Sequence, residues 1–283
     1  MKKRTRAEYT KRIDKFFSNW KGYTNEAEYL ERLANPSLEK WNFIQLNTVA
    51  HTESEMCQLQ FWHNPSPELF QRMVDALHIQ YIAYWSMWKK DEELRAEKKL
   101  TLSSELTTLP GFLLAMAMFA DDMLKERIVD VTTEALNYKT RNQFKLHVTT
   151  LPLATFLYQD ILTRKGVIWG KKEDVPIAPY DKVLANAATC SAEEVEGLLD
   201  DLMTYHLKTY HNDSFIANPF TDPTWGLFPV EAFALYRYWL IKRKLDIANL
   251  QFSDAMLAHY APYLQQAEYK ISPHIQKIID GLE

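Results

Sequence analysis

Hydrophobic residues recur along this chain at the spacing of a single helical face, and no strand-like alternation continues for more than a few residues. The clearest stripe follows the break Asn64-Pro65-Ser66-Pro67, where Ser66 suits an N-cap and Pro67 the first helical position. The pattern predicts an all-α fold, an irregular bundle of roughly ten or more helices. The predicted helices cover residues 5–20, 26–35, 37–62, 67–88, 110–119, 123–136, 141–163 (interrupted at Pro152), 191–210, 229–244, 253–266 and 272 onward.

Residues 229–244 predict a central helix, because only two of the residues 230–241 are charged. A helix that is apolar on nearly every face is surrounded by other helices. Pro229 suits the first helical position, which would make Phe228 the N-cap. Glu231 would then stand at the third position, where its carboxylate reaches back to the Phe228 N–H.

Segment 95–108 is polar, with clustered serine and threonine residues, and it separates two groups of predicted helices. We therefore expect an N-terminal helical unit over residues 1–104 and a C-terminal helical unit over residues 105–283. A chain of 283 residues is long enough to bury an ample core in either arrangement.

The sequence predicts a soluble protein of the reducing cytoplasm, with no membrane partner. No apolar run follows the basic N-terminal segment, which argues against a secretory signal. The longest apolar run, Phe112–Ala120, is far shorter than the roughly 20 residues that a membrane span needs. Cys57 and Cys190 provide neither a disulfide framework nor the spacing of metal ligands.

Charge is unevenly distributed, and residues 106–283 hold 17 Lys and Arg against 22 Asp and Glu. Nucleic-acid binding favours concentrated basic charge, so we expect no nucleic-acid partner. The acidic side chains are densest on the helix that Ser191 would cap, where they form either a partner-binding face or an ordinary solvated face. These candidate partner-binding residues are Glu193, Glu194, Glu196, Asp200 and Asp201.

Trp169 is a second candidate for partner binding, because it lies in the irregular stretch 164–180. A loop tryptophan is a natural anchor of a protein interface. The alternative is that Trp169 folds back over the core.

The usual catalytic constellations are missing from the sequence, which contains no H-E-x-x-H, P-loop, G-x-S-x-G or G-x-G-x-x-G motif. Asp75 and His78 fit the acid-x-x-His spacing of a helical di-metal site only loosely and have no counterpart on a second helix. Glu231 is the one carboxylate in a plainly apolar setting, which would suit either acid–base chemistry or a helix cap. The sequence predicts no cofactor, no metal site and no enzymatic activity.

The stretch Gly226-Leu227-Phe228-Pro229-Val230-Glu231-Ala232, with the apolar run 112–120 and the helix ending in Tyr205 and Tyr210 before it, resembles the C-terminal domain of the PoNi immunity family. The family pattern is Gly-Tyr-Trp-x-x-Glu-Ala-Ala, so Leu227 and Phe228 replace its Tyr and Trp. The resemblance covers residues 105–263, and Trp225, Gly226, Phe228 and Glu231 form its structural motif.

The resemblance implies an immunity protein that protects a bacterium from a secreted polymorphic toxin, such as a type VI secretion effector, and chiefly from PoNe-type DNases. Its partner would be a cognate toxin domain, bound so that the toxin's active site is occluded. The resemblance also implies that the Glu of the family motif, here Glu231, has an architectural role. Two other functions stay open: a helical hydrolase that uses Glu231 or the pair Asp75 and His78, and a helical-repeat adaptor.

Overall fold

The computed structural model describes residues 4–17, 43–97, 109–137, 151–163, 166, 169, 178–209 and 225–281. Within these ranges the fold is all-α, as predicted, and contains no strand. The helices are α1 (Arg6–Phe17), α3 (Phe43–His63), α4 (Pro67–Ala96), α5 (Leu109–Phe119), α6 (Asp122–Asn137), α7 (Leu151–Ile161), α8 (Tyr180–Ala187), α9 (Ala192–Thr209), α10 (Val230–Arg237), α11 (Ala255–Leu264) and α12 (Pro273–Asp280), and a π-helix, Tyr238–Lys242, continues α10.

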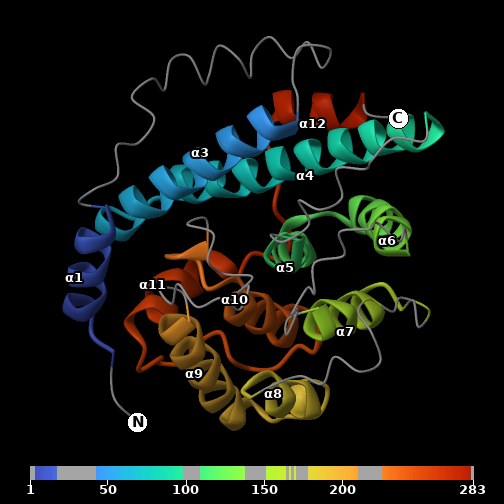
Figure 1. Ribbon diagram of the computed structural model, residues 1–283. Coiled ribbons are helices and arrows are strands. Elements are labelled where there is room, and N and C mark those ends of the chain that lie inside the picture. Colours follow the sequence, from blue (N-terminus) through green and yellow to red (C-terminus); the bar gives the residue numbers. More distant parts are fainter. Residues whose placement is uncertain are drawn as a thin grey trace.

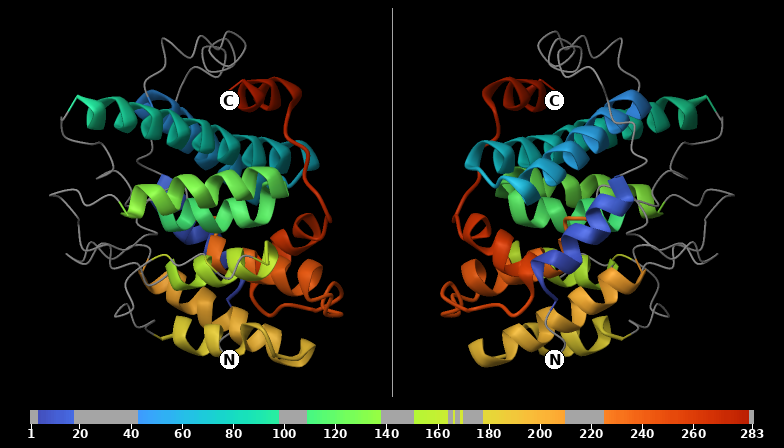
Figure 2. Two further views of the ribbon diagram at one scale, coloured as in Figure 1. Left: turned by 90° about the vertical axis from the view of Figure 1, so that its right-hand side faces the viewer. Right: turned by 90° about the vertical axis from the view of Figure 1, so that its left-hand side faces the viewer.

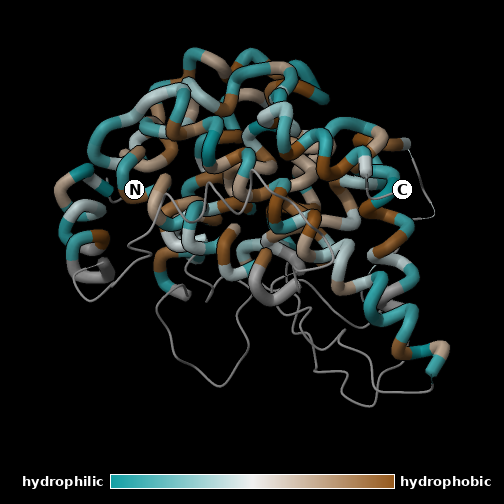
Figure 3. The backbone as a smooth tube through the Cα atoms, turned by 90° about the horizontal axis from the view of Figure 1, so that it is seen from above, coloured by the Kyte–Doolittle hydropathy of each residue, from teal (hydrophilic) through white to brown (hydrophobic). Residues whose placement is uncertain are grey.

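The helices lie in stacked layers (Figures 1 and 2). α3 and α4 run side by side as a long pair, with α12 against α4 on the outer side. α5 and α6 lie beneath this pair, followed by α7, α10 and α11, and α8 and α9 form the opposite end of the body. Viewed from above, hydrophilic and hydrophobic residues are interspersed along the helices, as expected where one face of each helix is buried (Figure 3).

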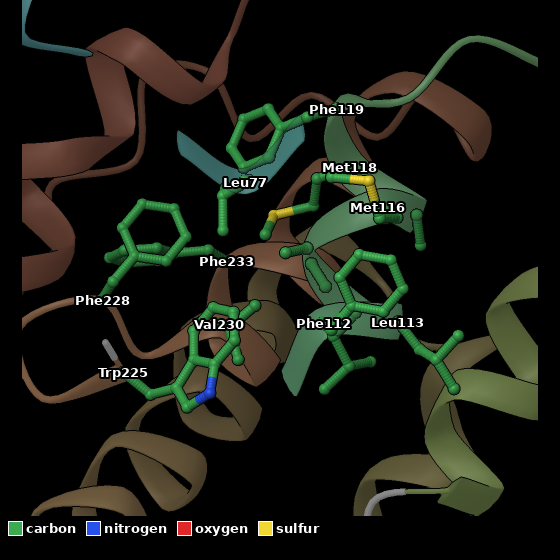
Figure 4. Close-up of a cluster of buried hydrophobic side chains, with 14 of the residues drawn as sticks. Leu77, Phe112, Leu113, Met116, Met118, Phe119, Trp225, Phe228, Val230 and Phe233 are labelled. Atoms are coloured by element: carbon green, nitrogen blue, oxygen red, sulfur yellow. The ribbon is translucent and has the colours of Figure 1, made fainter. Parts of the chain in front are cut away.

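α10 is the central helix that the sequence predicts. Every residue from 225 to 239 is buried, and α10 contacts α5, α9 and α11. α5 approaches this segment closely because Gly111 has no side chain: a Cβ at that position would lie 2.5 Å from Cε2 of the Trp225 indole. Phe112 and Leu113 of α5 gather with Phe233 and its neighbours in one apolar cluster (Figure 4).

Several helix starts confirm the predicted capping residues. The Ser66 hydroxyl accepts a hydrogen bond from the Leu69 N–H at 3.2 Å, and α4 begins at Pro67. The Ser191 N–H donates to the Glu194 carboxylate at 2.8 Å, which is one half of the predicted capping box. These local signals are strong because each satisfies a backbone group that the first helical turn leaves without an intrahelical partner.

Other boundaries differ from the prediction. α4 continues through the charged segment 89–93, where ion pairs of i,i+3 spacing join Lys89 to Glu92 at 3.3 Å and Lys90 to Glu93 at 2.6 Å. Pro152 lies in the first turn of α7, where proline is tolerated, and residues 141–150 of the segment predicted to be interrupted there lie outside the described residues. The sequence pattern did not predict α8, and the predicted helix over 26–35 lies outside the described residues.

The predicted division at 104/105 also lies outside the described residues and stays a prediction. The core on its two sides is continuous, because α4 contacts α5 and α6, and α12 returns from the C-terminal side to pack against α4. The side chains of α1 join the same core through Tyr9 and Ile13.

Candidate functional site: a buried histidine–glutamate pair

The most unusual polar group inside the protein is the side chain of Glu231, in the first turn of α10. Its Oε1 atom lies 2.7 Å from Nδ1 of His206, which comes from α9. The other ring nitrogen of His206, Nε2, lies 2.9 Å from the carbonyl oxygen of Trp225. Both side chains are completely buried, with no exposed surface. The pair therefore joins α9 to the start of α10 and to the turn that precedes it.

Two tyrosines surround this pair. The Tyr180 ring, from α8, meets the Tyr205 ring of α9 edge to face, with their centroids 5.3 Å apart. Burial raises the pKa of Tyr180 well above its usual value, and the Glu231 carboxylate raises it further. Burial and the same carboxylate also raise the pKa of Tyr205. Both hydroxyls therefore stay protonated at neutral pH, and although Tyr205 is partly exposed, the side chains of His206 and Glu231 have no surface open to a substrate.

Three buried polar atoms of this region have no hydrogen-bond partner among the described residues: Oε2 of Glu231, the hydroxyl of Tyr180 and Nε1 of Trp225. A buried polar atom without a partner costs free energy, of the order of 1–3 kcal/mol. The two hydrogen bonds of His206, to Glu231 and to the Trp225 carbonyl, offset part of this cost.

The predicted capping role of Glu231 is wrong. α10 begins at Val230 with Pro229 as its N-cap, so Glu231 stands one position earlier in the helix than the capping box requires. No side chain caps this helix start. The Phe228 N–H donates instead to the carbonyl of Trp225 at 3.3 Å, and the Glu231 carboxylate turns to the imidazole of His206.

The other motif residues are packed around the start of α10 (Figure 4). Trp225 has no exposed surface and lies against Gly111. Phe228 meets the rings of Phe233 and Tyr260 edge to face, at centroid distances of 4.9 and 5.6 Å. Gly226 is buried in the turn between them. The four motif residues, Trp225, Gly226, Phe228 and Glu231, thus all lie in the interior.

The five acidic candidates on α9 do not form one free surface. Asp200 pairs with Arg4, and both side chains are about five-sixths buried, with 17% and 16% of their surface exposed. The Glu196 carboxylate accepts a hydrogen bond from the Ser253 N–H at 3.0 Å. Asp201 pairs with Lys182 of α8. Glu196 and Asp200 therefore match neither the predicted partner-binding face nor the alternative of an ordinary solvated face, because both carboxylates hold α9 to other segments of this chain.

Glu193 and Glu194 remain exposed in the first turn of α9. The Ser191 hydroxyl lowers the pKa of Glu193, so its carboxylate is fully ionised at neutral pH. Glu193 and Glu194, with the surface pair of Asp201 and Lys182, are the part of the predicted partner-binding face that the fold leaves accessible.

The prediction that Trp169 is an exposed interface anchor is wrong, because only 4% of its surface is exposed. Its indole N–H donates to the Thr133 hydroxyl at 3.0 Å. Its ring meets that of Tyr158 edge to face at 5.1 Å. Trp169 therefore fills a site between α6 and α7, which is the alternative that the sequence left open.

Asp75 and His78 do not form a catalytic pair. The Asp75 carboxylate accepts hydrogen bonds from the Ser272 N–H at 2.9 Å and from the Gln71 amide at 3.1 Å, and so ties α4 to the start of α12. His78 donates from Nδ1 to the Val74 carbonyl at 2.8 Å. Burial lowers the pKa of His78 and keeps its ring neutral at pH 7. His78 borders a cavity of about 410 Å³, whose other walls come from α6, α12 and residues 269–271.

The contact between His206 and Glu231 was not predicted from the sequence, although one signal for it was present. Val195, Leu199 and Leu202 share one face of α9, and His206 continues the same face one turn further on. This periodicity marks His206 as a buried residue. It does not identify its partner, which is 25 positions away in the sequence.

Comparison of the chain with models of known protein families, with curated proteins and with solved structures found no match. Among the described residues, no three His, Cys, Asp or Glu side chains converge in a way that could hold a metal ion. The helices of the described ranges include none that is both long and apolar enough to cross a membrane.

Proposed function

We propose that this chain is an immunity protein, which binds a bacterial toxin domain and neutralises it by occluding the toxin's active site. In this proposal the protein catalyses no reaction and acts in the cytoplasm, where it meets a secreted antibacterial effector, with a nuclease as the favoured target. The proposal starts from the resemblance of residues 105–263 to the C-terminal domain of the PoNi immunity family.

The observation that carries the proposal is the complete burial of Glu231. The resemblance implies an architectural Glu, and here this side chain joins two helices at the centre of the body. A hydrolase that used Glu231 would need this carboxylate open to a substrate. Because the motif residues Trp225, Gly226, Phe228 and Glu231 all lie in the interior, we place the function on the outer surface of the protein, as the binding of a toxin requires.

The exposed carboxylates of Glu193 and Glu194 are the proposed contact with the toxin. They stand in the first turn of α9, which α10 and α8 hold in place. Acidic side chains would complement the basic surface with which a nuclease binds its substrate. Complementary charge speeds association and selects the partner.

The test begins with the gene immediately upstream of this chain's gene, which should encode a toxin domain, and measures the affinity of this chain for that domain. The wild-type protein should bind the domain, protect cells that express it, and bind more weakly as salt is raised. Failure to bind or to protect would contradict the proposed function itself.

Glu193→Lys tests the proposed contact surface, and Glu134→Lys is the matched control, since Glu134 is also exposed but lies on α6. Forcing like charges together costs several kcal/mol at an interface, so Glu193→Lys should weaken binding by at least tenfold. Glu134→Lys should melt close to wild type, whereas Glu193→Lys should fold but melt slightly lower, because it places a positive charge in the first turn of α9. Equal affinity of the two variants would move the contact away from α9.

A further inference from the structure

The two ring nitrogens of His206 both face oxygen atoms, and this fixes the number of protons that the site holds. Nε2 lies 2.9 Å from the Trp225 carbonyl oxygen, which can only accept a hydrogen bond, so Nε2 must carry a proton. Nδ1 lies 2.7 Å from Oε1 of Glu231. A hydrogen bond of that length requires one proton between these two atoms, either on Nδ1 or on Oε1.

An imidazolium with a carboxylate and an imidazole with a carboxylic acid contain the same number of protons. Both forms are neutral overall, which is the condition that a fully buried site favours. An imidazole with an ionised carboxylate has one proton fewer. In that form the lone pair of Nδ1 would face a lone pair of Oε1 at 2.7 Å, and the site would bury a net negative charge. The folded geometry therefore excludes it.

From this geometry we infer that the His206–Glu231 pair takes up one proton when the chain folds at neutral pH, and that the pair is a proton-dependent lock between α9 and α10. In the unfolded chain, histidine loses its extra proton near pH 6.5 and glutamate near pH 4.3. Above pH 6.5 the unfolded pair therefore holds one proton fewer than the folded pair. Folding draws this proton from the solvent, so a rise in pH above 6.5 lowers the free energy of unfolding.

The titratable groups that face the carboxylate within the described residues do not compete for this proton. Tyr180 approaches from α8 and Tyr205 from α9, and burial keeps both phenols protonated. From the described part of the turn before α10, the carbonyl of Trp225, which does not titrate, faces Nε2 of His206. The inference does not depend on the proposed function, since it concerns the interior of the protein.

Glu231→Gln is the variant that tests the lock. The Gln amide can donate to Nδ1 of His206 while Nε2 still donates to Trp225, so the same contacts form with no shared proton. The wild-type pair and the variant then differ by one proton across the whole interval from pH 5 to 8. The ratio of their folding constants, variant over wild type, should therefore rise tenfold for each pH unit.

The measurement is urea unfolding of both proteins at pH 5, 6, 7 and 8, with Glu53→Gln as the control. Glu53 is also buried, but it pairs with Arg72 at 2.7 Å, and arginine stays protonated over this range. The ratio for Glu53→Gln should not change with pH. A ratio for Glu231→Gln that is equally flat would overturn the inference.

A second measurement covers the case in which Glu231→Gln does not fold. Calorimetric unfolding of the wild-type protein at pH 7.5, in two buffers with different ionisation enthalpies, counts the protons released. Close to one proton should be released per chain. Unfolding without proton release would overturn the inference whatever the behaviour of the variant.

Discussion

At the scale of single residues, Gly111 and Gly197 illustrate how the surroundings of a helical glycine decide its role. Gly111 lies in α5 against the Trp225 indole, where an added Cβ would come within 2.5 Å of the ring. Gly197 lies on the exposed side of α9, where such a Cβ would have no atom within 4 Å apart from those of its chain neighbours and the backbone of its own helix. Only the first position uses the absence of a side chain for close packing.

We therefore expect opposite effects from the same substitution. Gly111→Ala should lower the free energy of unfolding by about 1–3 kcal/mol, because the rigid indole is held on all sides and has to shift. Gly197→Ala should raise it by about 1 kcal/mol, since alanine is the better helix former. Urea unfolding of the two variants measures the difference. Equal stability of both variants would mean that α5 does not approach Trp225 as closely as described.

The residue scale also shows where the sequence was informative about the candidate site. The stretch around Glu231 stands out in the sequence as apolar and motif-like, and its burial follows from that pattern. The role assigned to Glu231 was wrong by one helical position, because the start of α10 depends on how Trp225 and Phe228 pack and not on local capping preferences. The partner His206 depends on how α9 crosses α10, which no local pattern encodes.

At the scale of elements, the N-terminal segment is attached by a network centred on Asp254, the N-cap of α11. The Asp254 carboxylate accepts hydrogen bonds from the Met256 and Leu257 N–H groups at 2.9 and 3.1 Å. It also accepts from the Arg4 guanidinium at 2.5 Å and from the Tyr9 hydroxyl at 2.7 Å. One buried side chain thus caps one helix and holds another.

Asp254→Ala should therefore cost more than the loss of a cap. We expect a loss of roughly 2–4 kcal/mol in the free energy of unfolding, about 1 for the cap and the remainder for the hydrogen bonds that Asp254 makes with Arg4 and Tyr9. Asp121→Ala is the control, because Asp121 is exposed and caps α6 through the Leu124 N–H. That substitution should cost about 1 kcal/mol. Equal costs, measured in urea, would show that the attachment of α1 contributes nothing.

The elements also differ in how well the sequence predicted them. α4, α9 and α12 each combine an apolar stripe with a serine at or next to the N-cap, and their starts were predicted to within a residue. α8 has only eight residues and was missed. Its buried residues, Tyr180, Val183 and Ala187, are too few to establish a helical period, and their burial comes from contact with α7 and α9.

At the scale of the whole molecule, stability should depend on pH through histidines that folding keeps neutral. His259 of α11 donates from Nε2 to the Phe61 carbonyl at 3.0 Å and accepts at Nδ1 from the Arg6 guanidinium at 3.2 Å. Burial lowers the pKa of His259, and the neighbouring Arg6 lowers it further, although the Phe61 carbonyl opposes both. Protonation would break the contact with Arg6 and so loosen α1 from α3 and α11.

The direction of the effect follows from the lowered pKa of His259. Above pH 6.5 the ring is neutral in both the folded and the unfolded chain, so its contribution to stability is constant. As the pH falls below 6.5, His259 binds a proton in the unfolded chain but stays neutral in the folded chain. The free energy of unfolding therefore falls, by at most about 1.4 kcal/mol per pH unit. His78, whose pKa burial also lowers, should contribute a loss in the same direction.

His259→Gln tests this assignment, because an amide can keep both hydrogen bonds without binding a proton. Between pH 6.5 and 5.5, the variant should lose less stability than the wild type, by no more than about 1 kcal/mol, because the unfolded ring is already half protonated at pH 6.5 and solvent partly screens the half-buried folded ring. His274→Gln is the control, since His274 is exposed on α12 and should leave the pH dependence of the wild type unchanged. Urea unfolding at the two pH values, with hydrogen exchange of the α1 amides, measures the whole molecule and the local attachment together. An identical loss in wild type and His259→Gln would show that this histidine does not hold α1 in a pH-dependent way.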